Sequence, residues 1–579
     1  MPRLPSSPFF LLLLSLSLFS LLLLTSGAAA SSSSSASSAC KSTLYPKLCR
    51  SMLSTIRSSP SDPYSYGKFS IKQCLKQARK TSTTINHFLG KIKHKSFFIN
   101  DSESNALEDC QQFSELNVEH LEAISIELKS AETLNEELVD KVQTLLSGIV
   151  TNQQTCYDGL VVSKSSVLGN TTALAVAFSN VTQLYSVSLG LVTQSLARNL
   201  KKHKRGSEGS GTKNVHKFRE PLETFIKVKL LTLRKSSGKN STISERGERI
   251  LEEMKSSGIL VNDIVIVSPY GTDNFTSIGD AITSAPEKLK LEDGYFVIYV
   301  RGGCYHEYIV IAKHKTNIML LGDGINSTVI TGNHSFVDGW TTFNSSTFAV
   351  SAERFVAIDI TFRNTAGPEK HQAVAVRNNA DLSTFYRCSF EGYQDTLYVH
   401  SLRQFYKECD IYGTVDFIFG NAAAVLQSCN LYARKPMPNQ KNAFTAQGRT
   451  DPNQNTGISI HNCTIEAAPD LAADLNSTLN FLGRPWKVFS RTVIMQSYIG
   501  PLISSVGWLE WNGTVGLDTL FYGEFQNHGP GANTTKRVQW PGYSLMNATQ
   551  ALNFTVSNFT LGDTWLPDTD IPFYGGLLN

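Results

Sequence analysis

Several sequence signatures are missing from this chain of 579 residues, and each absence excludes a class of function. There is no Gly-x-Ser-x-Gly nucleophile elbow, no His-Glu-x-x-His zinc motif and no glycine loop that could cradle phosphates. Patches of Lys and Arg interspersed with aromatic residues, which are typical of nucleic-acid binding, are absent as well. We therefore expect neither a nucleotide cofactor nor a nucleic-acid partner.

Long apolar runs are also scarce, because none after the N-terminal segment could span a bilayer. Residues 1–30 are typical of a secretory signal peptide, in which a basic residue precedes an apolar run over 9–24 and small residues follow. A transmembrane anchor is the less favoured alternative, since that run is short and is interrupted by Ser15, Ser17 and Ser20. We expect a secreted protein that has no membrane contact once the signal is removed.

The composition is that of a folded protein, with 41% hydrophobic and 18% charged residues. The length exceeds that of one ordinary domain, so two or more cores are expected. A formal net charge of +4 mildly favours a polyanionic partner.

Secretion affects how the ten cysteines are interpreted, because disulfides are the default for well-placed pairs in an oxidising compartment. Asn-x-Ser/Thr sequons recur along the chain, for example at Asn170, Asn180 and Asn326, and indicate a surface that can be glycosylated.

Residues 31–200 are predicted to be helical. Apolar residues recur at steps of three to five positions over 107–128, 138–149 and 174–191, which indicates amphipathic helices with short connections. Such helices form a small four-helix bundle. Cys40 and Cys49 bracket a short loop, Cys110 and Cys156 fall on neighbouring helices, and Cys74 is left over.

Residues 201–261 are a linker by composition, with the basic run Lys201–Arg205 followed by Gly and Ser. A basic run of this kind is either simply solvated or a processing site in a secretory chain, and both interpretations remain open.

Residues 262–579 are predicted to form short strands, including Ile264–Val267, Phe296–Val300, Ile318–Leu321 and Phe355–Phe362. A unit of Cys, polar and apolar residue begins at Cys388, Cys409 and Cys429, in steps of 409 − 388 = 21 and 429 − 409 = 20 residues, and is echoed at Cys463. Self-similarity at this period with short strands predicts a β-helix. We expect the cysteines to form a buried column in which Cys409 and Cys429 are bonded, and Cys304 to be free.

The same repeat aligns chemically active residues. Asp395 and Asp416 each follow a repeat cysteine by seven residues, and Gln372 and Gln394 are 394 − 372 = 22 residues apart. Equivalent positions on adjacent coils would bring two carboxylates to about one strand spacing, ~4.8 Å. Such a pair does not ionise freely, so one member becomes an acid and the other a base or nucleophile. A polar ladder on a solenoid surface is the alternative, which the neighbouring Tyr393, Tyr398, Phe417 and Phe419 make less plausible.

Residues 262–579 resemble the plant pectin methylesterases across the whole segment. The matching motifs are Gly303-Cys304-Tyr305-His306-Glu307, Gln372-Ala373-Val374-Ala375-Val376-Arg377, Gly392-Tyr393-Gln394-Asp395-Thr396-Leu397-Tyr398, Asp416-Phe417-Ile418-Phe419-Gly420 and Leu482-Gly483-Arg484-Pro485-Trp486. The resemblance implies a right-handed parallel β-helix, a secreted enzyme of the cell wall and a homogalacturonan substrate.

The resemblance also implies the role of each site residue. Asp416 would be the nucleophile and Asp395 the proton donor and later the base. Gln394 and Gln372 would stabilise the oxyanion, while Thr342, Arg484 and Trp486 would contact substrate. Two carboxylates, an arginine and two amides complete such a mechanism, so no metal or other cofactor is expected.

The helical segment resembles the pectinesterase-inhibitor family in the placement of Cys40, Cys49, Cys110 and Cys156 and in Thr155-Cys156-Tyr157-Asp158-Gly159. That resemblance implies the disulfides Cys40–Cys49 and Cys110–Cys156 and an inhibitory or chaperoning pro-region. Cys74 is extra, and the processing motif of the family is represented only by Lys229-Leu230-Leu231. Expected protein partners are the chain's own pro-region and inhibitor-family proteins, and the chain is expected to be a monomer.

Other functions fit less well. A lyase on the same fold would need an acidic calcium site, and an inverting glycosidase needs carboxylates far enough apart to admit a water. A catalytically weak protein that acts mainly as an inhibitor or binds pectin is the alternative from a different class.

Overall fold

The computed structural model describes residues 36–56, 63–93, 101–131, 135–163, 173–206, 258–271 and 273–578. The expected signal peptide, most of the basic linker and the Lys229 motif lie outside these residues. No helix among the described residues is long and apolar enough to cross a bilayer.

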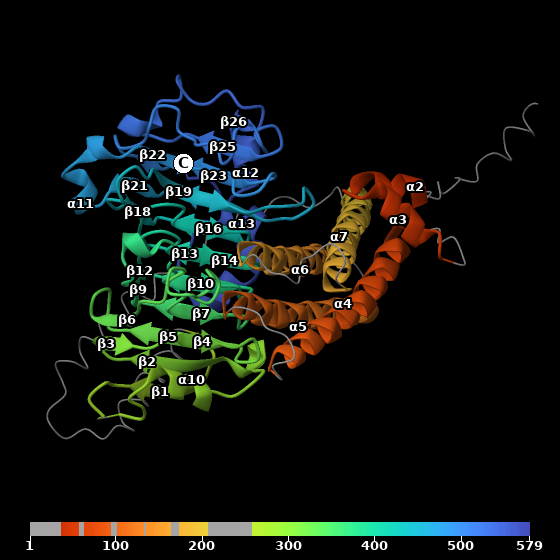
Figure 1. The fold of residues 1–579 in the computed structure, drawn as a ribbon, viewed down its shortest axis with the longest axis horizontal. Coiled ribbons are helices and arrows are strands. Elements are labelled where there is room, and N and C mark those ends of the chain that lie inside the picture. The colour runs from red at the N-terminus through yellow and green to blue at the C-terminus, as the bar shows by residue number, and fades with distance from the viewer. Residues whose placement is uncertain are drawn as a thin grey trace, which may run out of the picture.

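The described part consists of a helical bundle beside a large β domain, as Figure 1 shows. Four long helices make up the bundle, which confirms the predicted helical fold. The four are α4 (Pro63–Lys93), α5 (Asp101–Ser130), α6 (Glu136–Val162) and α7 (Ala173–Gly206), and the short helices α2 (Ala36–Ala39) and α3 (Pro46–Leu53) precede them.

Helix α6 illustrates how the sequence sets the helix ends. Asn135 is the N-cap, because its side chain accepts a hydrogen bond of 2.8 Å from the backbone N–H of Leu138. Glu136 and Glu137 in the first turn complement the positive end of the helix dipole.

Disulfides join Cys40 to Cys49 and Cys110 to Cys156, as the family resemblance implied.

The β domain is a parallel β-helix, which confirms the predicted solenoid. Its coils contribute strands to three sheets, in which every pairing between neighbouring strands is parallel. Sheet A contains β1 (Val261–Val267), β2 (Tyr295–Val300), β5 (Ile318–Gly322), β8 (Val356–Ile358), β11 (Ser383–Tyr386), β14 (Arg403–Lys407), β17 (Ala423–Gln427), β20 (Gly457–His461), β23 (Arg491–Met495), β25 (Phe521–Phe525) and β26 (Tyr543–Leu545).

The other two sheets are shorter. Sheet B contains β3 (Gly303–His306), β6 (Thr328–Gly332), β9 (Thr361–Asn364), β12 (Ser389–Glu391), β15 (Asp410–Gly413), β18 (Asn430–Ala433), β21 (Thr464–Ala467) and β24 (Tyr498–Ile499). Sheet C contains β4 (Ile309–Ile311), β7 (Phe348–Val350), β10 (Val376–Asn378), β13 (Leu397–Val399), β16 (Ile418–Gly420), β19 (Asn442–Gln447) and β22 (Asn480–Gly483).

One predicted strand was wrong in its extent. The segment Phe355–Phe362 is divided between β8 and β9, which lie in different sheets. Asp359 has a φ of 59° and makes the corner between them. A corner of this kind cannot be seen in an apolar run, because only the backbone changes direction.

Stacked aromatic rings fill the interior of the β-helix. Phe348, Phe362, Phe385 and Phe390 are fully buried, with ring centres 4.8 Å apart for Phe348 and Phe362 and 5.4 Å for Phe385 and Phe390. Truncating a buried Phe to Ala costs roughly 3–5 kcal/mol in proteins. The ladder of rings therefore helps to hold each coil on the next.

Short elements close the ends and one side of the β-helix. Residues of α12 (Ala548–Leu552), α13 (Val556–Phe559) and the segment after them pack on sheet A around Phe405 and Val425. Helix α10 (Ile278–Ser284) covers the first coil, where both oxygens of Glu307 accept hydrogen bonds from the backbone N–H groups of Ile278 and Gly279. Glu307, the last residue of the first family motif, thus holds α10 on the first coil.

The predicted disulfide between Cys409 and Cys429 was wrong. Both are free and buried, as are Cys388 and Cys463, while Cys304 is free and exposed as expected. The residues that follow the repeat cysteines pair in register, so the four side chains point the same way at about one strand spacing, ~4.8 Å. A disulfide needs Cβ atoms that converge to about 3.8 Å. The Cys429 sulfur instead accepts a hydrogen bond of 3.4 Å from the backbone N–H of Cys409.

A count of free thiols tests this correction. Alkylation in denaturant without a reducing agent should modify six cysteines, because six are free in the structure. Alkylation of the folded chain should modify only the exposed Cys304. Intact mass spectrometry measures both numbers, and four modified thiols in denaturant would restore the bond between Cys409 and Cys429.

Candidate active site

Two carboxylates stand at the same corner of adjacent coils. Asp395 and Asp416 lie two positions before β13 and β16, whose residues Leu397 and Ile418 pair directly. Both aspartates have left-handed backbones, with φ of 63° and 53°. Asp is among the residues that tolerate this conformation, which other side chains rarely adopt. The corner therefore places the two carboxylates about one strand spacing apart, ~4.8 Å.

The two predicted glutamines are aligned by an irregularity in the ladder. Ala373 donates its backbone N–H to the carbonyl of Gln394. In a parallel ladder this hydrogen bond makes position 373 level with position 395, an offset of 22 residues between the two coils. The carbonyl of Thr396 then accepts from both Ala375 at 2.9 Å and Val376 at 3.3 Å, and the offset becomes 21 in the strands. This bulge absorbs one residue, so Gln372 is level with Gln394 just as Asp395 is level with Asp416.

Arg484 binds one member of the carboxylate pair. Its Nε and Nη2 atoms donate hydrogen bonds of 2.7 and 2.6 Å to the two oxygens of Asp416. This is the bidentate geometry in which a guanidinium fixes the plane of a carboxylate. Arg484 follows β22 directly and its guanidinium lies 4.4 Å from the ring centre of Trp511.

The environments of the two carboxylates differ. Burial raises the pKa of Asp395 well above its usual value, the neighbouring Asp416 raises it further, and Arg484 only partly opposes this. Burial also raises the pKa of Asp416, but both the hydrogen bonds and the charge of Arg484 lower it. On balance the pKa of both carboxyls is raised, and more strongly for Asp395, so a proton shared by the pair favours Asp395 over Asp416.

A row of aromatic side chains runs beside this pair. We call Phe343, Tyr398, Phe419 and Trp486 the aromatic row. The rings of Tyr398 and Phe419 stack with centres 4.1 Å apart, and Phe343 and Trp486 extend the row at 6.4 and 6.1 Å. The row crosses several coils on the sheet C side, where it offers flat apolar faces.

Other residues singled out from the sequence lie elsewhere. Thr342 belongs to the turn before β7, next to Phe343 of the aromatic row. Phe417 points into the interior, where its ring centre is 4.9 Å from that of Phe444. The guanidinium of Arg434 lies over the Tyr393 ring, 3.8 Å from the ring centre. No group of three or more His, Cys, Asp or Glu side chains within the described ranges is placed to hold a metal ion.

Phe343, Trp511 and the buried His400 are site neighbours that the sequence analysis did not identify. Phe343 directly follows Thr342, so the neighbourhood of a predicted substrate contact was the available signal. His400 lies two residues after Tyr398 and packs against Phe343, with ring centres 5.4 Å apart. Burial and the nearby Arg377 lower the pKa of His400 well below its usual value, so the ring is neutral.

The helical bundle covers the aromatic row. Phe113, Cys156, Leu160 and Phe178 of the bundle belong to the same apolar cluster as the aromatic row. Phe113 stacks on His400 at 5.5 Å and meets Phe343 edge-on at 4.5 Å. In the structure the apolar surface beside Asp395 and Asp416 is therefore occupied by side chains of the bundle.

Polar contacts from helix α5 surround this apolar patch. Asp109 accepts hydrogen bonds from the Thr341 hydroxyl at 2.7 Å and from the side-chain amide of Asn344. Burial raises the pKa of Asp109 to about 7, although the Thr341 hydrogen bond and the charge of Arg377 oppose this. The interface thus holds this carboxyl partly protonated near neutral pH.

Helix α6 makes polar contacts along much of its length. The Thr155 hydroxyl lies 3.0 Å from Nε2 of His400, and the Asn421 amide donates a hydrogen bond of 2.9 Å to the Thr151 hydroxyl. Further along, Lys487 forms an ion pair with Asp158. These catalytic-domain residues follow strands of sheet C, so α6 spans several coils.

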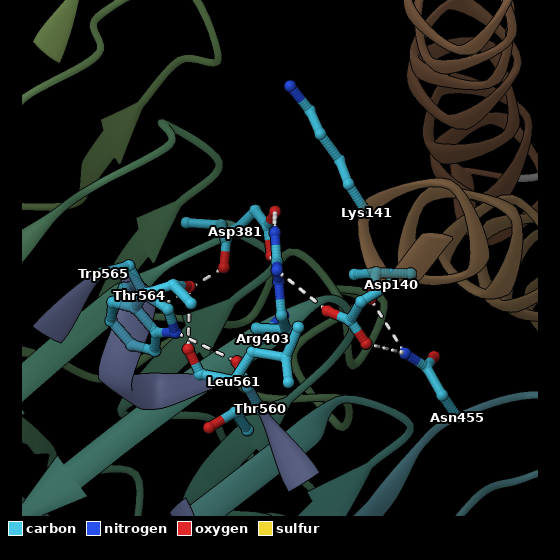
Figure 2. Close-up of polar contacts among 12 residues, drawn as sticks. Asp140, Lys141, Asp381, Arg403, Asn455, Thr560, Leu561, Thr564 and Trp565 are labelled. Atoms are coloured by element: carbon cyan, nitrogen blue, oxygen red, sulfur yellow. Dashed lines mark hydrogen bonds and ion pairs between the residues drawn. The ribbon is translucent and has the colours of Figure 1, made fainter. Parts of the chain in front are cut away.

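A buried arginine joins the two domains. Figure 2 shows Arg403 between Asp381 of its own domain and Asp140 of α6, with Asn455 beyond. Arg403 donates hydrogen bonds of 2.7 Å to Asp381 and 2.9 Å to Asp140, and is only 4% exposed. Burial raises the pKa of Asp140, while Arg403 lowers it. Removing one partner of such a pair is strongly destabilising, because a buried charge is left uncompensated.

The residue next to this arginine enters the bundle. Leu402 is part of the apolar core formed by α4 to α7. It lies against Gly148 of α6, where a Cβ atom would come within 2.8 Å of its side chain. A larger side chain at position 148 would therefore have to displace the Leu402 side chain.

Comparison with protein families identifies two regions. The pectinesterase family model matches residues 264–563. The family model for plant invertase/pectin methylesterase inhibitor matches residues 34–191.

Similar full-length proteins combine both regions. The chain is 65% identical over 545 residues to probable pectinesterase/pectinesterase inhibitor 47 of Arabidopsis thaliana, covering 93% of this chain and 86% of that protein. It is 62% identical over 543 residues to the Arabidopsis protein numbered 25, covering 93% of this chain and 87% of that one. Its identity to pectinesterase/pectinesterase inhibitor PPE8B of Prunus persica is 45%, over 81% of this chain and 82% of the peach protein.

A solved structure resembles the β domain. The pectin methylesterase from carrot has 52% sequence identity and a TM-score of 0.53, and the match covers 54% of this chain and 98% of the carrot chain. The match covers almost all of the carrot chain, so that chain consists of little more than a β domain of this kind.

The buried carboxyl Asp395 should reduce stability at neutral pH. Because its folded-state pKa is raised above the unfolded value, its contribution to stability is fully present below that unfolded pKa and is lost as the pH rises through the folded pKa. A difference of one between the folded and unfolded pKa corresponds to about 1.4 kcal/mol of stability. Asp395→Asn should therefore raise the unfolding temperature relative to wild type at pH 7 more than at pH 4, measured by thermal unfolding.

Asp518→Asn, which changes an exposed carboxyl, is the matched control and should show no such pH-dependent difference. If Asp395→Asn gave no greater stabilisation at pH 7 than at pH 4, Asp395 would not be the protonated member of the pair.

Proposed function

Because the chain belongs to the pectinesterase family and carries an inhibitor-type helical domain before its catalytic domain, we propose that it hydrolyses the methyl esters of pectin through Asp416 and Asp395 while the bundle restrains it. The chain is a carboxylic ester hydrolase of that family. The two catalytic assignments depend chiefly on one observation. Asp395 is aligned with Asp416, and Arg484 donates two hydrogen bonds to the Asp416 carboxylate.

Asp416 is the nucleophile in the proposed mechanism. Arg484 keeps it ionised and oriented, so one of its oxygens can attack the carbonyl carbon of a galacturonate methyl ester. The carbonyl oxygen becomes an oxyanion, which side-chain amide N–H groups of Gln372 and Gln394 stabilise from two adjacent coils. Collapse of this intermediate breaks the bond to the methoxy group.

Asp395 is the proton donor and then the base in the proposed mechanism. Its raised pKa keeps it protonated, so it can give its proton to the departing methoxy oxygen and release methanol. The resulting carboxylate then takes a proton from a water molecule, whose oxygen attacks the acyl-enzyme. This second step breaks the bond between the acyl carbon and the Asp416 oxygen, so Asp416 is regenerated as a carboxylate and Asp395 as the protonated acid. The product leaves as galacturonic acid, which gives up its own carboxyl proton to the solvent. All atoms and protons are accounted for by the ester, water and these two residues.

Substrate contacts are proposed for the residues around the pair. Trp486 and the rest of the aromatic row present flat faces on which sugar rings can rest, and Thr342 lies next to the row at Phe343. Arg484 lies between Asp416 and Trp511, so it can position substrate as well as the nucleophile. The mildly basic charge of the chain suits an anionic polysaccharide.

The bundle is proposed to restrain the enzyme until the two are separated. It packs on the aromatic row, and Asp395 and Asp416 are only 7% and 5% exposed in the uncut chain. Tethering raises the local concentration of the bundle to roughly millimolar, so a modest interface is mostly occupied. Pectin cannot reach the aromatic row while the bundle side chains occupy it.

Secretion to the cell wall completes the proposal. A signal peptide over 1–30, Asn-x-Ser/Thr sequons and a pectin substrate all agree with this location. We further propose that cleavage within the basic linker over 201–261 separates the domains, and that the enzyme acts as a monomer.

Changes in the carboxylate pair test the proposed chemistry. Asp416→Asn should abolish methanol release from methylated pectin, because the proposed acyl-enzyme forms on the Asp416 carboxylate. Asp395→Asn should be severely impaired, since an amide can neither protonate methanol nor activate water. Gln394→Ala should lose about 100- to 1000-fold in kcat, as expected for one oxyanion donor. The assay uses residues 258–579 of each variant.

Tyr270→Ala, which alters an exposed side chain before helix α10, is the control for expression and handling. The assignment would be refuted by near-normal turnover in folded Asp416→Asn or Asp395→Asn.

Restraint can be loosened from the bundle side alone. Gly148→Leu should force the bundle away from Leu402 and raise methanol release by the uncut chain. Overpacking of this kind costs typically about 1–3 kcal/mol, or about 5- to 160-fold in docking. Gly90→Leu is the matched control, because a Cβ atom at Gly90 of α4 would meet nothing within 4 Å. Equal activity of the two uncut variants would contradict restraint through this interface.

A further inference from the structure

The bundle presents a carboxylate beside the aromatic row. Asp158 of α6 has both side-chain oxygens 2.8 Å from Nζ of Lys487. Gln154, one turn earlier, donates a hydrogen bond of 2.8 Å to the same carboxylate. The side chains of Lys487 and Asp158 are only 21% and 24% exposed, so the ion pair is largely shielded from water.

Lys487 is connected to the catalytic pair through a short stretch of chain. Arg484, which binds Asp416, is followed by Pro485, Trp486 and Lys487. The Lys487 ammonium lies 5.2 Å from the ring centre of Trp486, at the end of the aromatic row. A ligand resting on Trp486 would therefore meet this positive charge.

The substrate of the proposed function carries the same chemical group as Asp158. Each hydrolysed unit of pectin bears a free carboxylate, whereas an esterified unit bears a neutral ester at that place. We propose that Lys487 binds the free carboxylate of a de-esterified galacturonate unit beside Trp486, and so makes the enzyme favour chains that already carry such units. In the uncut chain, Asp158 stands in for this carboxylate.

This inference depends on the proposed function and adds a specificity-determining residue to it. A charge-assisted hydrogen bond to a carboxylate is roughly twice as strong as a hydrogen bond to a neutral acceptor such as an ester carbonyl. When the bundle leaves, Lys487 loses the partner that it has in the structure, and a uronate can replace it. The product of one turnover then improves binding of the same chain for the next.

The test compares two substrates on the β domain, residues 258–579, released from the expressed full chain by a specific protease site placed between Gly206 and Gly258. Fully methyl-esterified and half de-esterified galacturonate oligomers of equal length are the probes. The wild type should show a KM that is roughly threefold to tenfold lower for the half de-esterified oligomers, with similar kcat for both. Raised salt should reduce the difference, because ionic interactions are screened.

Substitutions of Lys487 should act on this difference in KM. Lys487→Gln should remove it, Lys487→Glu should reverse it and Lys487→Arg should retain it. Lys313→Gln is the matched control, because Lys313 also pairs with a bundle carboxylate, Glu119 at 2.8 Å, but follows β4 at the far end of sheet C. The control should keep the wild-type substrate difference.

Two results would overturn the inference. One is an unchanged difference in KM in both Lys487→Gln and Lys487→Glu. The other is an equal loss of kcat on both oligomers, which would place Lys487 in the chemical step. A wild-type segment without esterase activity on either oligomer would instead refute the proposed function itself.

A charge exchange separates the two partners of Lys487. In the full chain, Lys487→Glu alone should weaken retention of the bundle after the linker is cut between Gly206 and Gly258. Adding Asp158→Lys should restore retention, because the ion pair is re-formed with reversed charges. The doubly substituted β domain should still lack the preference for de-esterified oligomers, and recovery of that preference would contradict a direct contact with substrate.

Discussion

The register of one coil on the next is the constraint from which the rest of the site follows. Parallel pairing of β13 with β16 puts Asp395 level with Asp416, and a bulge at Ala375 and Val376 brings Gln372 level with Gln394. A shift of one residue would turn these side chains to the other face of the strand. The aromatic ladder inside the coils and the row of rings outside them depend on the same pairing.

Burial of the surface beside Asp395 and Asp416 relates the proposed ester hydrolysis to its proposed restraint by the bundle. The carboxylate pair is buried, and the bundle packs on the neighbouring apolar surface that sugar rings are proposed to use. The interface is mixed in character, since Arg403 and Asp140 form a buried ion pair next to the apolar contact of Leu402 with Gly148. The desolvation cost of a buried ion pair offsets much of its attraction, whereas apolar contacts favour association. Together they fix one docked arrangement.

The repeat in the sequence was sufficient to predict the β-helix and the alignment of the carboxylates. Its period shows directly in the spacing of Cys388, Cys409 and Cys429, and side chains at equivalent positions stack. The same regularity was misread at Cys409 and Cys429, because stacked side chains point in parallel and their Cβ atoms do not converge. Proximity in a ladder is therefore a poor guide to bonding.

Contacts between the domains could not be predicted in this way. The pairs Thr155 with His400 and Asp158 with Lys487 join segments more than 200 residues apart, and no periodicity relates an α-helix to the corners of a solenoid. Gly148 illustrates the difficulty, because a glycine within a helix signals only reduced propensity until its neighbour Leu402 is known. Docked surfaces of this kind depend on three-dimensional shape.

Restraint of the catalytic domain by the bundle is the central claim, and separating the two tests it most directly. A specific protease site placed between Gly206 and Gly258 would allow one preparation to be assayed before cutting and after removal of the bundle. The account predicts little methanol release per active site from the uncut chain and a large increase once the bundle is removed. Equal rates before and after would contradict it.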